Sequence, residues 1–382
     1  MAATVPSGFM EMLASEAAAG IGGRLVGPDV AFDGARALLD LAAFARHRFD
    51  GRVVGVPGSV GKTSTKDLIA AACAAQRRTT ANERSFNNEQ GLPVTILDAP
   101  DETEVLVVEM GMRGFGEITK LCDVAQPHIG VVTAVGHSHT ERVGGIDGVA
   151  KAKRELVEAL PSSGVAVLNA DDERVMAMAK HTAADVLTYG SAGDVAMSAV
   201  VLDELARPRF MIESPWGRAD VRLSVSGAHM ASNAAAAIAV ACSVGVDLDA
   251  AVDAAESATV SQMRMEVSRA PTGAVVINDA YNANPTSMAA ALDALASMQA
   301  TRRIAILGAM GELDDPGTGH RDVARRAEAS GIQLVATGTE LYGVRPTDDP
   351  VGHIGALGHG DVVLVKASRA AGLERVVAQL VG

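Results

Sequence analysis

Short runs of β-branched and aliphatic residues alternate with alanine-rich stretches of helical character along most of the chain. The strand-like runs of the first half are residues 53–56, 105–110, 129–135 and 165–170. Those of the second half are residues 274–280, 302–308, 332–338 and 361–367. Because each run is largely apolar and a helical segment follows it, the pattern predicts βαβ units that build parallel sheets.

Between the two series the pattern changes. Residues 195–225 alternate polar and apolar positions around Pro and Gly turns, which is typical of antiparallel hairpins. An alanine-rich pair of helices is expected over 231–255, and the second α/β series begins after it. We therefore predict three parts: a leader segment (1–48), a central parallel-sheet domain (49–262) and a C-terminal Rossmann-like α/β domain (263–382).

Composition makes the chain a folded protein of enzyme size. It has 382 residues, of which 48% are hydrophobic and 21% are charged, values typical of globular domains and unlike those of disordered chains. Its 33 basic and 46 acidic residues give a net charge of −13. Such a field repels the phosphates of nucleic acids and of anionic membranes, so we expect neither partner. An anionic ligand would need a local cationic site.

Cysteine use and hydropathy favour a cytoplasmic setting. Cys73, Cys122 and Cys242 are too scattered for a disulfide framework or a zinc site. The longest apolar run, residues 234–242, is about half of the roughly 20 residues that a membrane span needs. Residues 1–23 contain acidic residues and no basic stretch, unlike a secretory signal. We therefore expect a reduced, cytoplasmic enzyme without a membrane span, and the sequence leaves its oligomeric state open.

The strongest local signal is GVPGSVGKTST, residues 55–65, which joins a predicted strand to a predicted helix. A glycine-rich turn lets backbone N–H groups close around phosphate oxygens, and the helix N-terminus adds positive potential. In such a P-loop Lys62 reaches the β- and γ-phosphates, and the Thr63 hydroxyl binds Mg²⁺. The first glycine of the usual pattern is replaced by Val56, and we still predict a nucleoside triphosphate site. The residues predicted to hold the nucleotide here are Gly58, Ser59, Gly61, Lys62, Thr63 and Ser64.

A second group of candidate ligands follows later strands. Glu109 lies near the end of the run at 105–110, and His139 follows the run at 129–135. The carboxyl ends of parallel strands meet at one edge of a sheet, so these side chains can converge on the P-loop as metal ligands. Lys151 and Lys153 lie on the next predicted helix. Residue chemistry alone leaves open whether either is more than part of a solvated basic face.

Longer segments carry a family resemblance. In chain order they are GSVGKTSTK, NERSFNNEQGLPVTIL, VVEMG, GHSHTERVGGIDGVAKAKRE, LNADD, GAHMASNAAAAIA, INDAYNANPTSM, GAMGELDDPGTGH and LVKASR. Together, over residues 25–382, they resemble the Mur ligase family. The segments INDAYNANPTSM and LVKASR are most similar to the branch that adds D-alanyl-D-alanine to a UDP-N-acetylmuramoyl tripeptide in peptidoglycan synthesis.

The resemblance implies an ATP-dependent acid–amino-acid ligase. A substrate carboxylate attacks the γ-phosphate of ATP, which gives ADP and an acyl phosphate, and an incoming amine then displaces phosphate to form an amide. Two Mg²⁺ ions neutralise the phosphoryl oxygens in such chemistry. By resemblance, Lys62 holds phosphates, Thr63 and Glu109 hold the first ion, and His139 helps to hold the second. Lys153 matches the lysine that the family carbamylates with CO₂ to make a metal ligand; a plain Lys153 cation facing a substrate carboxylate is the alternative.

Further residues take roles by resemblance alone. Asn233 is expected near the adenine, Arg264 on the phosphates from the domain junction, and Asp279 on the ribose hydroxyls. The residues expected to face the other two substrates are Asn87 and Asn88 for the acyl acceptor, and Lys366, Ser368 and Arg369 for the incoming amine or its carboxylate, with Asn282 as a further substrate contact.

The segment before the P-loop departs from the family pattern. The family's first domain, which holds the UDP moiety, is longer than the stretch available in residues 1–48, so we expect a reduced form of it with the UDP-binding part largely missing. A second hypothesis is therefore a paralogue that joins an amino acid or dipeptide to a smaller, non-UDP acid. A non-catalytic ATP-binding partner is disfavoured by the full set of metal-type residues, and a P-loop kinase or GTPase by the lack of guanine-reading or switch motifs.

Overall fold

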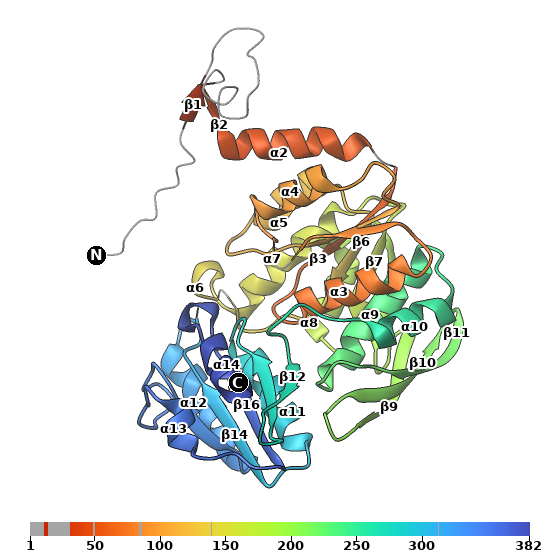
Figure 1. The fold of residues 1–382 in the computed structure, drawn as a ribbon. Coiled ribbons are helices and arrows are strands. Elements are labelled where there is room, and N and C mark those ends of the chain that lie inside the picture. Colours follow the sequence, from red (N-terminus) through yellow and green to blue (C-terminus); the bar gives the residue numbers. More distant parts are fainter. Residues whose placement is uncertain (1–10, 14–30, 49, 84–85, 139, 312) are drawn as a thin grey trace.

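The strands of the described residues form a nine-stranded sheet, a five-stranded sheet and a short two-stranded sheet (Figure 1). The computed structural model describes residues 11–13, 31–48, 50–83, 86–138, 140–311 and 313–382. In the two-stranded sheet β1 (Glu11–Leu13) pairs antiparallel with β2 (Ala31–Asp33).

The nine-stranded sheet has the order β11-β10-β9-β8-β7-β6-β3-β5-β4. The pairs from β4 to β9 are parallel, and β9, β10 and β11 pair antiparallel. The strand order reverses at β3, between β5 and β6, which is where open α/β sheets bind their ligands. The strands are β3 (Arg52–Val56), β4 (Thr79–Ala81), β5 (Val105–Glu109), β6 (Ile129–Val132), β7 (Val165–Asn169), β8 (Asp185–Gly190), β9 (Val195–Leu202), β10 (Pro208–Ser214) and β11 (Gly217–Arg222).

Helices cover both faces of this sheet because its strands alternate two apolar faces. Val54 and Val56 of β3 pack on one side, and Val53 packs on the other. The first side carries α3 (Lys62–Ala74), α9 (His229–Ser243) and α10 (Leu248–Ser257). The second side carries α4 (Gly91–Asp98), α5 (Glu117–Ala125) and α7 (Ile146–Ala159), with α2 (Gly34–Ala45) packed outside α4 and α5. Shorter elements are η1 (Arg46–Arg48), α6 (Thr140–Val143), α8 (Glu173–Met176) and η2 (Ala179–His181).

The five-stranded sheet has the order β12-β13-β16-β14-β15, in which only β12 and β13 pair antiparallel. Helices α11 and α12 pack against one face, and α13 and α14 against the other. The elements are β12 (Glu266–Arg269), β13 (Val275–Asp279), α11 (Pro285–Ser297), β14 (Arg302–Leu307), α12 (Pro316–Ala329), β15 (Gln333–Ala336), α13 (Pro350–Ile354), β16 (Asp361–Lys366), η3 (Arg369–Ala371) and α14 (Glu374–Val381). The structure therefore confirms the predicted α/β class, both parallel series and the antiparallel hairpins.

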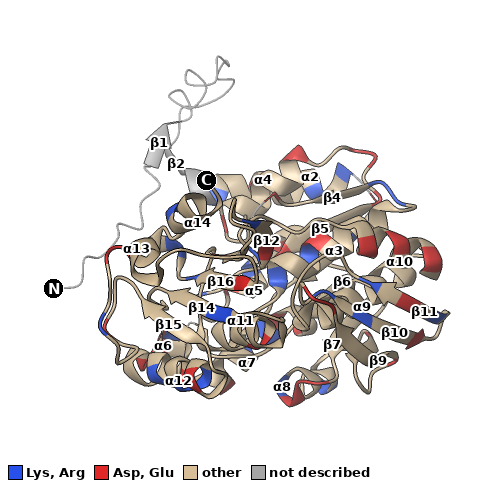
Figure 2. Ribbon diagram, turned by 60° about the horizontal axis from the view of Figure 1, so that its bottom comes forward, with Lys and Arg blue, Asp and Glu red and all other residues tan. Residues whose placement is uncertain are grey.

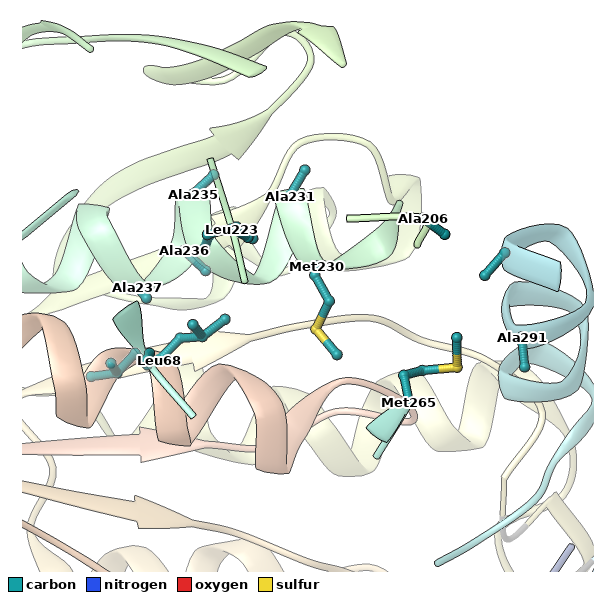
Figure 3. Close-up of a cluster of buried hydrophobic side chains, with 14 of the residues drawn as sticks. Leu68, Ala206, Leu223, Met230, Ala231, Ala235, Ala236, Ala237, Met265 and Ala291 are labelled. Atoms are coloured by element: carbon teal, nitrogen blue, oxygen red, sulfur yellow. The ribbon is translucent and has the colours of Figure 1, made fainter. Parts of the chain in front are cut away.

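One contiguous apolar core joins the two large sheets. The alanines of α9, which are fully buried, let this helix lie close to α3 and Leu68. Figure 3 shows this cluster continuing through Met230 and Met265 towards Ala291 of α11. Met230 is 1% exposed and Met265 is 4% exposed, so both methionines are core residues although they lie at the junction between the sheets.

Charge is distributed over the outer helices. Figure 2 shows acidic and basic residues interleaved on α12, whereas α10 carries acidic residues. Cys73, Cys122 and Cys242 are all buried and free. Within the described ranges, no helix combines the length and the apolar character that crossing a bilayer would require.

The α3–α9 contact gives a first prediction. Leu68→Ala should lower the free energy of unfolding by about 2–5 kcal/mol, because the truncation opens a cavity in a fully buried position. Chemical denaturation monitored by circular dichroism measures the change. Leu41→Ala is the matched control, since Leu41 is also helical but 53% exposed, and its cost should stay within about 0.5 kcal/mol. Equal losses in the two variants would contradict this description of the core.

Candidate active site

The loop between β3 and α3 is held from behind by the segment that follows β6. The backbone N–H of Ser59 donates to the carbonyl of Ala134 at 2.8 Å. The Ser59 hydroxyl donates to the Gly136 carbonyl at 3.0 Å and accepts from the Gly136 N–H at 2.9 Å. The hydroxyl of Thr133 donates to the Val60 carbonyl at 2.6 Å. These bonds fix the loop shape before any ligand binds.

Glycine is required at two points of this loop. A Cβ at Gly58 would lie 1.8 Å from the Thr133 hydroxyl oxygen, so no side chain fits there without movement. Gly61 has a left-handed φ of 80° and is the N-cap residue directly before α3, a helix of 13 residues. A Cβ at Gly61 would lie 2.9 Å from the Asn233 carboxamide oxygen. The loop therefore exposes backbone N–H groups at a helix N-terminus, which is the cradle that a phosphate needs.

Lys62 and Thr63 begin the helix and face this cradle from different sides. The Lys62 ammonium donates to the Gly58 carbonyl at 2.9 Å, so it lies over its own loop. The Thr63 hydroxyl donates to the Glu109 carboxylate at 2.7 Å, across from the end of β5. Ser64, the next residue, is 6% exposed. The structure thus brings together the P-loop residues that the sequence singled out.

Glu109 is held in a fixed orientation. Its second carboxylate oxygen accepts from the Asn87 amide at 2.7 Å, and its backbone N–H donates to the Asn82 side chain at 2.8 Å. Glu109 is 1% exposed. A carboxylate and a hydroxyl oxygen that already touch, both buried, are oxygen donors that suit Mg²⁺. Within the described ranges, no group of three or more His, Cys, Asp and Glu side chains gathers as a metal cage. A metal here would therefore also need ligands such as phosphate oxygens or water.

Lys153 is the other buried charge of the site. It lies on α7, is 2% exposed, and takes part in no ion pair among the described residues. Burial, and secondly the positive charge of Lys62, hold the pKa of Lys153 well below its usual value. A neutral amine near Lys62 is the form that reacts with CO₂, so the residue fits the expected carbamate. Its neighbour Lys151 is exposed and lies 5.3 Å from the centre of the Phe115 ring. His139 lies outside the described residues.

Arg264 reaches the P-loop from the linker between the two sheets. Its guanidinium donates to the Thr63 hydroxyl oxygen at 3.0 Å and stacks over the Tyr281 ring, 4.1 Å from the ring centre. The Nε–H of Arg264 is buried and finds no acceptor within the described part of the chain. A buried cationic donor beside a phosphate cradle fits a further phosphate oxygen.

Asp279 and Lys366 form a buried ion pair next to Arg264. Their charged atoms are 2.6 Å apart, and Asp279 also accepts from the backbone N–H of Met265 at 3.3 Å. The Lys366 ammonium donates as well to the Asn282 carbonyl at 2.8 Å. Asp279 is thus hydrogen-bonded to Met265, the residue that follows Arg264, and its expected contact with the ribose stays a prediction. Lys366 pairs with Asp279, and its expected place at the amine stays a prediction.

The remaining predicted residues are Asn233, Asn88, Arg369, Asn282 and Ser368. Asn233, 8% exposed, faces the Gly61 end of the P-loop and donates to the Met230 sulfur at 3.4 Å. The Asn88 side-chain oxygen accepts from the N–H groups of Gln90 and Gly91 at the start of α4. Arg369 is exposed and pairs with Glu374 at 2.9 Å. Asn282 is exposed and Ser368 is half-buried, both beside the Lys366 strand end. Their substrate contacts stay predictions.

The structure adds residues that the sequence reasoning did not single out. The Asn284 amide, at the cap of α11, donates to the Ser59 carbonyl at 3.5 Å. The Thr140 hydroxyl donates to Asp314 at 2.8 Å, which is a second bridge between the sheets. Thr133 and Asn82 support the P-loop and Glu109 from behind. Asn284, Asn82, Thr140 and Asp314 lie within the quoted motif segments, so their signal was present in the sequence, whereas Thr133 appears only through its tertiary contact.

Comparisons with known proteins identify this arrangement. Residues 56–241 match the Mur ligase middle domain, and residues 263–369 match the Mur ligase glutamate ligase domain. The chain is 42% identical over 370 residues to the UDP-N-acetylmuramoyl-tripeptide–D-alanyl-D-alanine ligase of Mycobacterium bovis, covering 86% of this chain and 72% of the relative. The structure of MurF from Acinetobacter baumannii has a TM-score of 0.84 and 28% identity over 94% of this chain and 83% of that one. The MurF ligase of Thermotoga maritima, solved in complex with ADP, has a TM-score of 0.84 and 26% identity over 94% and 86% of the chains.

The fold and site define a nucleotide-dependent ligase that forms C–N bonds. The chain belongs to the Mur ligase family. The resemblance drawn from the sequence motifs is confirmed, and so is the enzyme class.

Gly58 provides a second prediction. Gly58→Ala should weaken the binding of a Mg²⁺–ATP analogue by at least about tenfold, because the new Cβ displaces the Thr133 hydroxyl and reshapes the cradle. Isothermal titration calorimetry measures the affinity. Gly114→Ala is the control, since its Cβ would meet only the Glu117 side chain at 3.5 Å. Unchanged affinity in the Gly58 variant would show that the loop does not hold the phosphates.

Proposed function

We propose that this protein joins D-alanyl-D-alanine to the terminal carboxylate of a UDP-N-acetylmuramoyl tripeptide, with cleavage of ATP to ADP and phosphate. The 42% identity to a ligase of that name, over 86% of the chain, favours this pair of substrates. The observation that carries the chemistry is the buried junction at which Thr63, Glu109 and Arg264 meet beside the P-loop. It supplies neutralising groups where a phosphoryl group would be transferred.

The residues of this junction have separate tasks in the proposed reaction. The loop N–H groups and Lys62 bind the phosphates of ATP and hold the γ-phosphate for in-line attack by the substrate carboxylate. Arg264 reaches the site from the linker to the other sheet and neutralises negative charge on the phosphates. Thr63 and Glu109 would hold Mg²⁺, whose charge lowers the barrier to attack on the phosphoryl group. Asn87 keeps Glu109 oriented. The product of this step is an acyl phosphate, and the D-alanyl amine displaces phosphate from it to form the amide.

We assign Lys153 a carbamate made from CO₂, facing a second Mg²⁺ for which His139 is the other predicted ligand. Carbamylation replaces a cation by an anion. This fits a site in which burial and Lys62 already disfavour the ammonium form of Lys153. The plain-cation alternative is less consistent with this environment, because a Lys153 cation near Lys62 would have no ion-pair partner among the described residues. Asn233 on the adenine side and Asp279 at the ribose complete the proposed nucleotide site. The free, buried cysteines agree with a reducing compartment, and a cytoplasmic location stays a prediction.

The substrate assignment is tested by measuring ADP release across acceptors. With ATP and D-alanyl-D-alanine present, turnover should occur with the UDP-linked tripeptide, and mass spectrometry should show the pentapeptide product. Lys62→Ala should reduce turnover by about 100-fold or more, since electrostatic stabilisation of the transferred phosphoryl group is lost. Lys180→Ala, at an exposed lysine away from the site, is the control. Turnover on smaller acids without UDP, and none on the UDP-linked tripeptide, would replace this proposal by the paralogue hypothesis.

The Lys153 assignment is tested with labelled bicarbonate. In ¹³C-bicarbonate a carbamate resonance should appear in the wild type and in Lys151→Ala, and it should be missing in Lys153→Ala. Because CO₂ reacts with the neutral amine, the signal and the ligation rate should fall together as the pH falls and Lys153 becomes protonated. Lys153→Ala should lose ligation, and a small added carboxylate should partly restore it. Full activity of the unrescued variant would eliminate the carbamate.

A further inference from the structure

Lys366 ends the central strand of the five-stranded sheet. The register of that sheet sets Lys366 of β16 opposite Asp279 of β13 on one side and Leu307 of β14 on the other. Lys366 is 2% exposed and Asp279 is 8% exposed. The Lys366 ammonium donates one hydrogen bond to the Asp279 carboxylate and one to the Asn282 carbonyl. Asp279 is the last residue of β13, and Asn282 follows shortly after it. The charge of Lys366 is therefore used inside the protein.

Asp279 connects Lys366 to the linker between the two sheets. Its free oxygen accepts from the N–H of Met265, and Met265 has a left-handed backbone with φ of 53°. Met263 is also left-handed, with φ of 59°. Such conformations are unfavourable for residues with a side chain and persist only where the surroundings impose them. The hydrogen bond to Asp279 is one such restraint, and the burial of the Met265 side chain is another.

Arg264 lies between these two methionines. Its direction towards the P-loop is set by the backbone on either side of it, and its guanidinium meets the Thr63 hydroxyl and the Tyr281 ring. A continuous set of contacts thus runs from Lys366 through Asp279 and Met265 to Arg264. The other end of the linker is fixed separately, because Ser261 donates both its N–H and its hydroxyl to Asp67 of α3, at 2.7 and 2.8 Å.

We propose that Lys366 is a positioning residue of the nucleotide site, which acts through Asp279 and Met265 to aim Arg264 at the P-loop. The proposal rests on the proposed function only in taking ATP as the nucleotide. It moves Lys366 from the amine side of the reaction, where the sequence motif suggested it, to the phosphate side. Removing its charge would leave the Asp279 carboxylate buried without a counter-ion and free to turn, so the linker would lose its restraint.

The experiment is a double-mutant cycle on nucleotide affinity. Calorimetry measures binding of Mg²⁺ with a non-hydrolysable ATP analogue to the wild type, Lys366→Met, Arg264→Met and the double variant. Lys366→Met should weaken binding by about tenfold, and it should have no further effect once Arg264 is replaced, because residues that act through one another are non-additive. The KM for D-alanyl-D-alanine should stay within about twofold of wild type in Lys366→Met, since no lost contact to the amine is involved.

A matched control lies at the opposite end of the same strand. Arg302 pairs with Asp361, the first residue of β16, at 2.6 Å. Arg302→Met breaks an ion pair of the same sheet and should lower the melting temperature while the nucleotide affinity stays unchanged. This separates a general loss of stability from a loss of positioning.

Two results would overturn the proposal. Additive losses in the Lys366 and Arg264 variants would show that the two residues act independently. An unchanged nucleotide affinity with a raised KM for the dipeptide would return Lys366 to the amine. If Lys366→Met does not fold, Asp279→Asn/Lys366→Met removes both members of the pair; measured relative to Asp279→Asn alone, so that loss of the proposed ribose contact is subtracted, it must show the same non-additivity with Arg264→Met. Binding of the nucleotide needs neither acceptor nor amine, so a failure of the substrate assignment would leave this test intact.

Discussion

The junction beside the P-loop depends on the hydroxyl of Thr63. It donates to Glu109 and accepts from Arg264, so one oxygen joins the P-loop helix, the end of β5 and the linker to the second sheet. A hydroxyl fills this position because the same atom can both donate and accept a hydrogen bond. Lys62 and the loop N–H groups come from one sheet, whereas Arg264 and Asp279 come from the junction with the other. The site is therefore complete only when both sheets are in place.

The P-loop differs from this junction in how it is supported. Ser59 and Thr133 tie the loop to the segment after β6 through backbone and hydroxyl bonds, so its shape is fixed by its own sheet. Among the described residues, Arg264 donates one hydrogen bond to that sheet, and its buried Nε–H has no acceptor. The loop is rigid, whereas Arg264 still has a hydrogen-bond donor to offer. This arrangement suits a ligand whose phosphates bind first to the loop and then accept a hydrogen bond from Arg264.

Local patterns predicted much of this architecture, and tertiary contacts account for what they left out. The apolar runs gave the buried parallel strands, because both faces of those strands are covered. Short or half-exposed strands were missed: β4 has three residues, and β8 and β12 have exposed positions that break the apolar signal.

At the site, the P-loop could be predicted from its motif, and Glu109 from its place at the end of a strand. Asn88 was expected to face a substrate; its side-chain oxygen accepts from the N–H groups of Gln90 and Gly91, a local bond that no motif indicated, and the substrate contact stays a prediction. Lys366 could not be oriented from the sequence, since its partner Asp279 lies 87 positions away.

The shared core bears on how this molecule could be divided. By sequence, the boundary near residue 262 separates two α/β series, each with its own sheet. Met265, however, lies beyond that boundary and packs in one cluster with Met230 of α9. Excising either half at this point would expose apolar surface that the intact chain keeps from water, and would also remove Arg264 from Thr63. The two halves are thus separable as lengths of sequence but not as independently soluble pieces, so an isolated half would be prone to self-association.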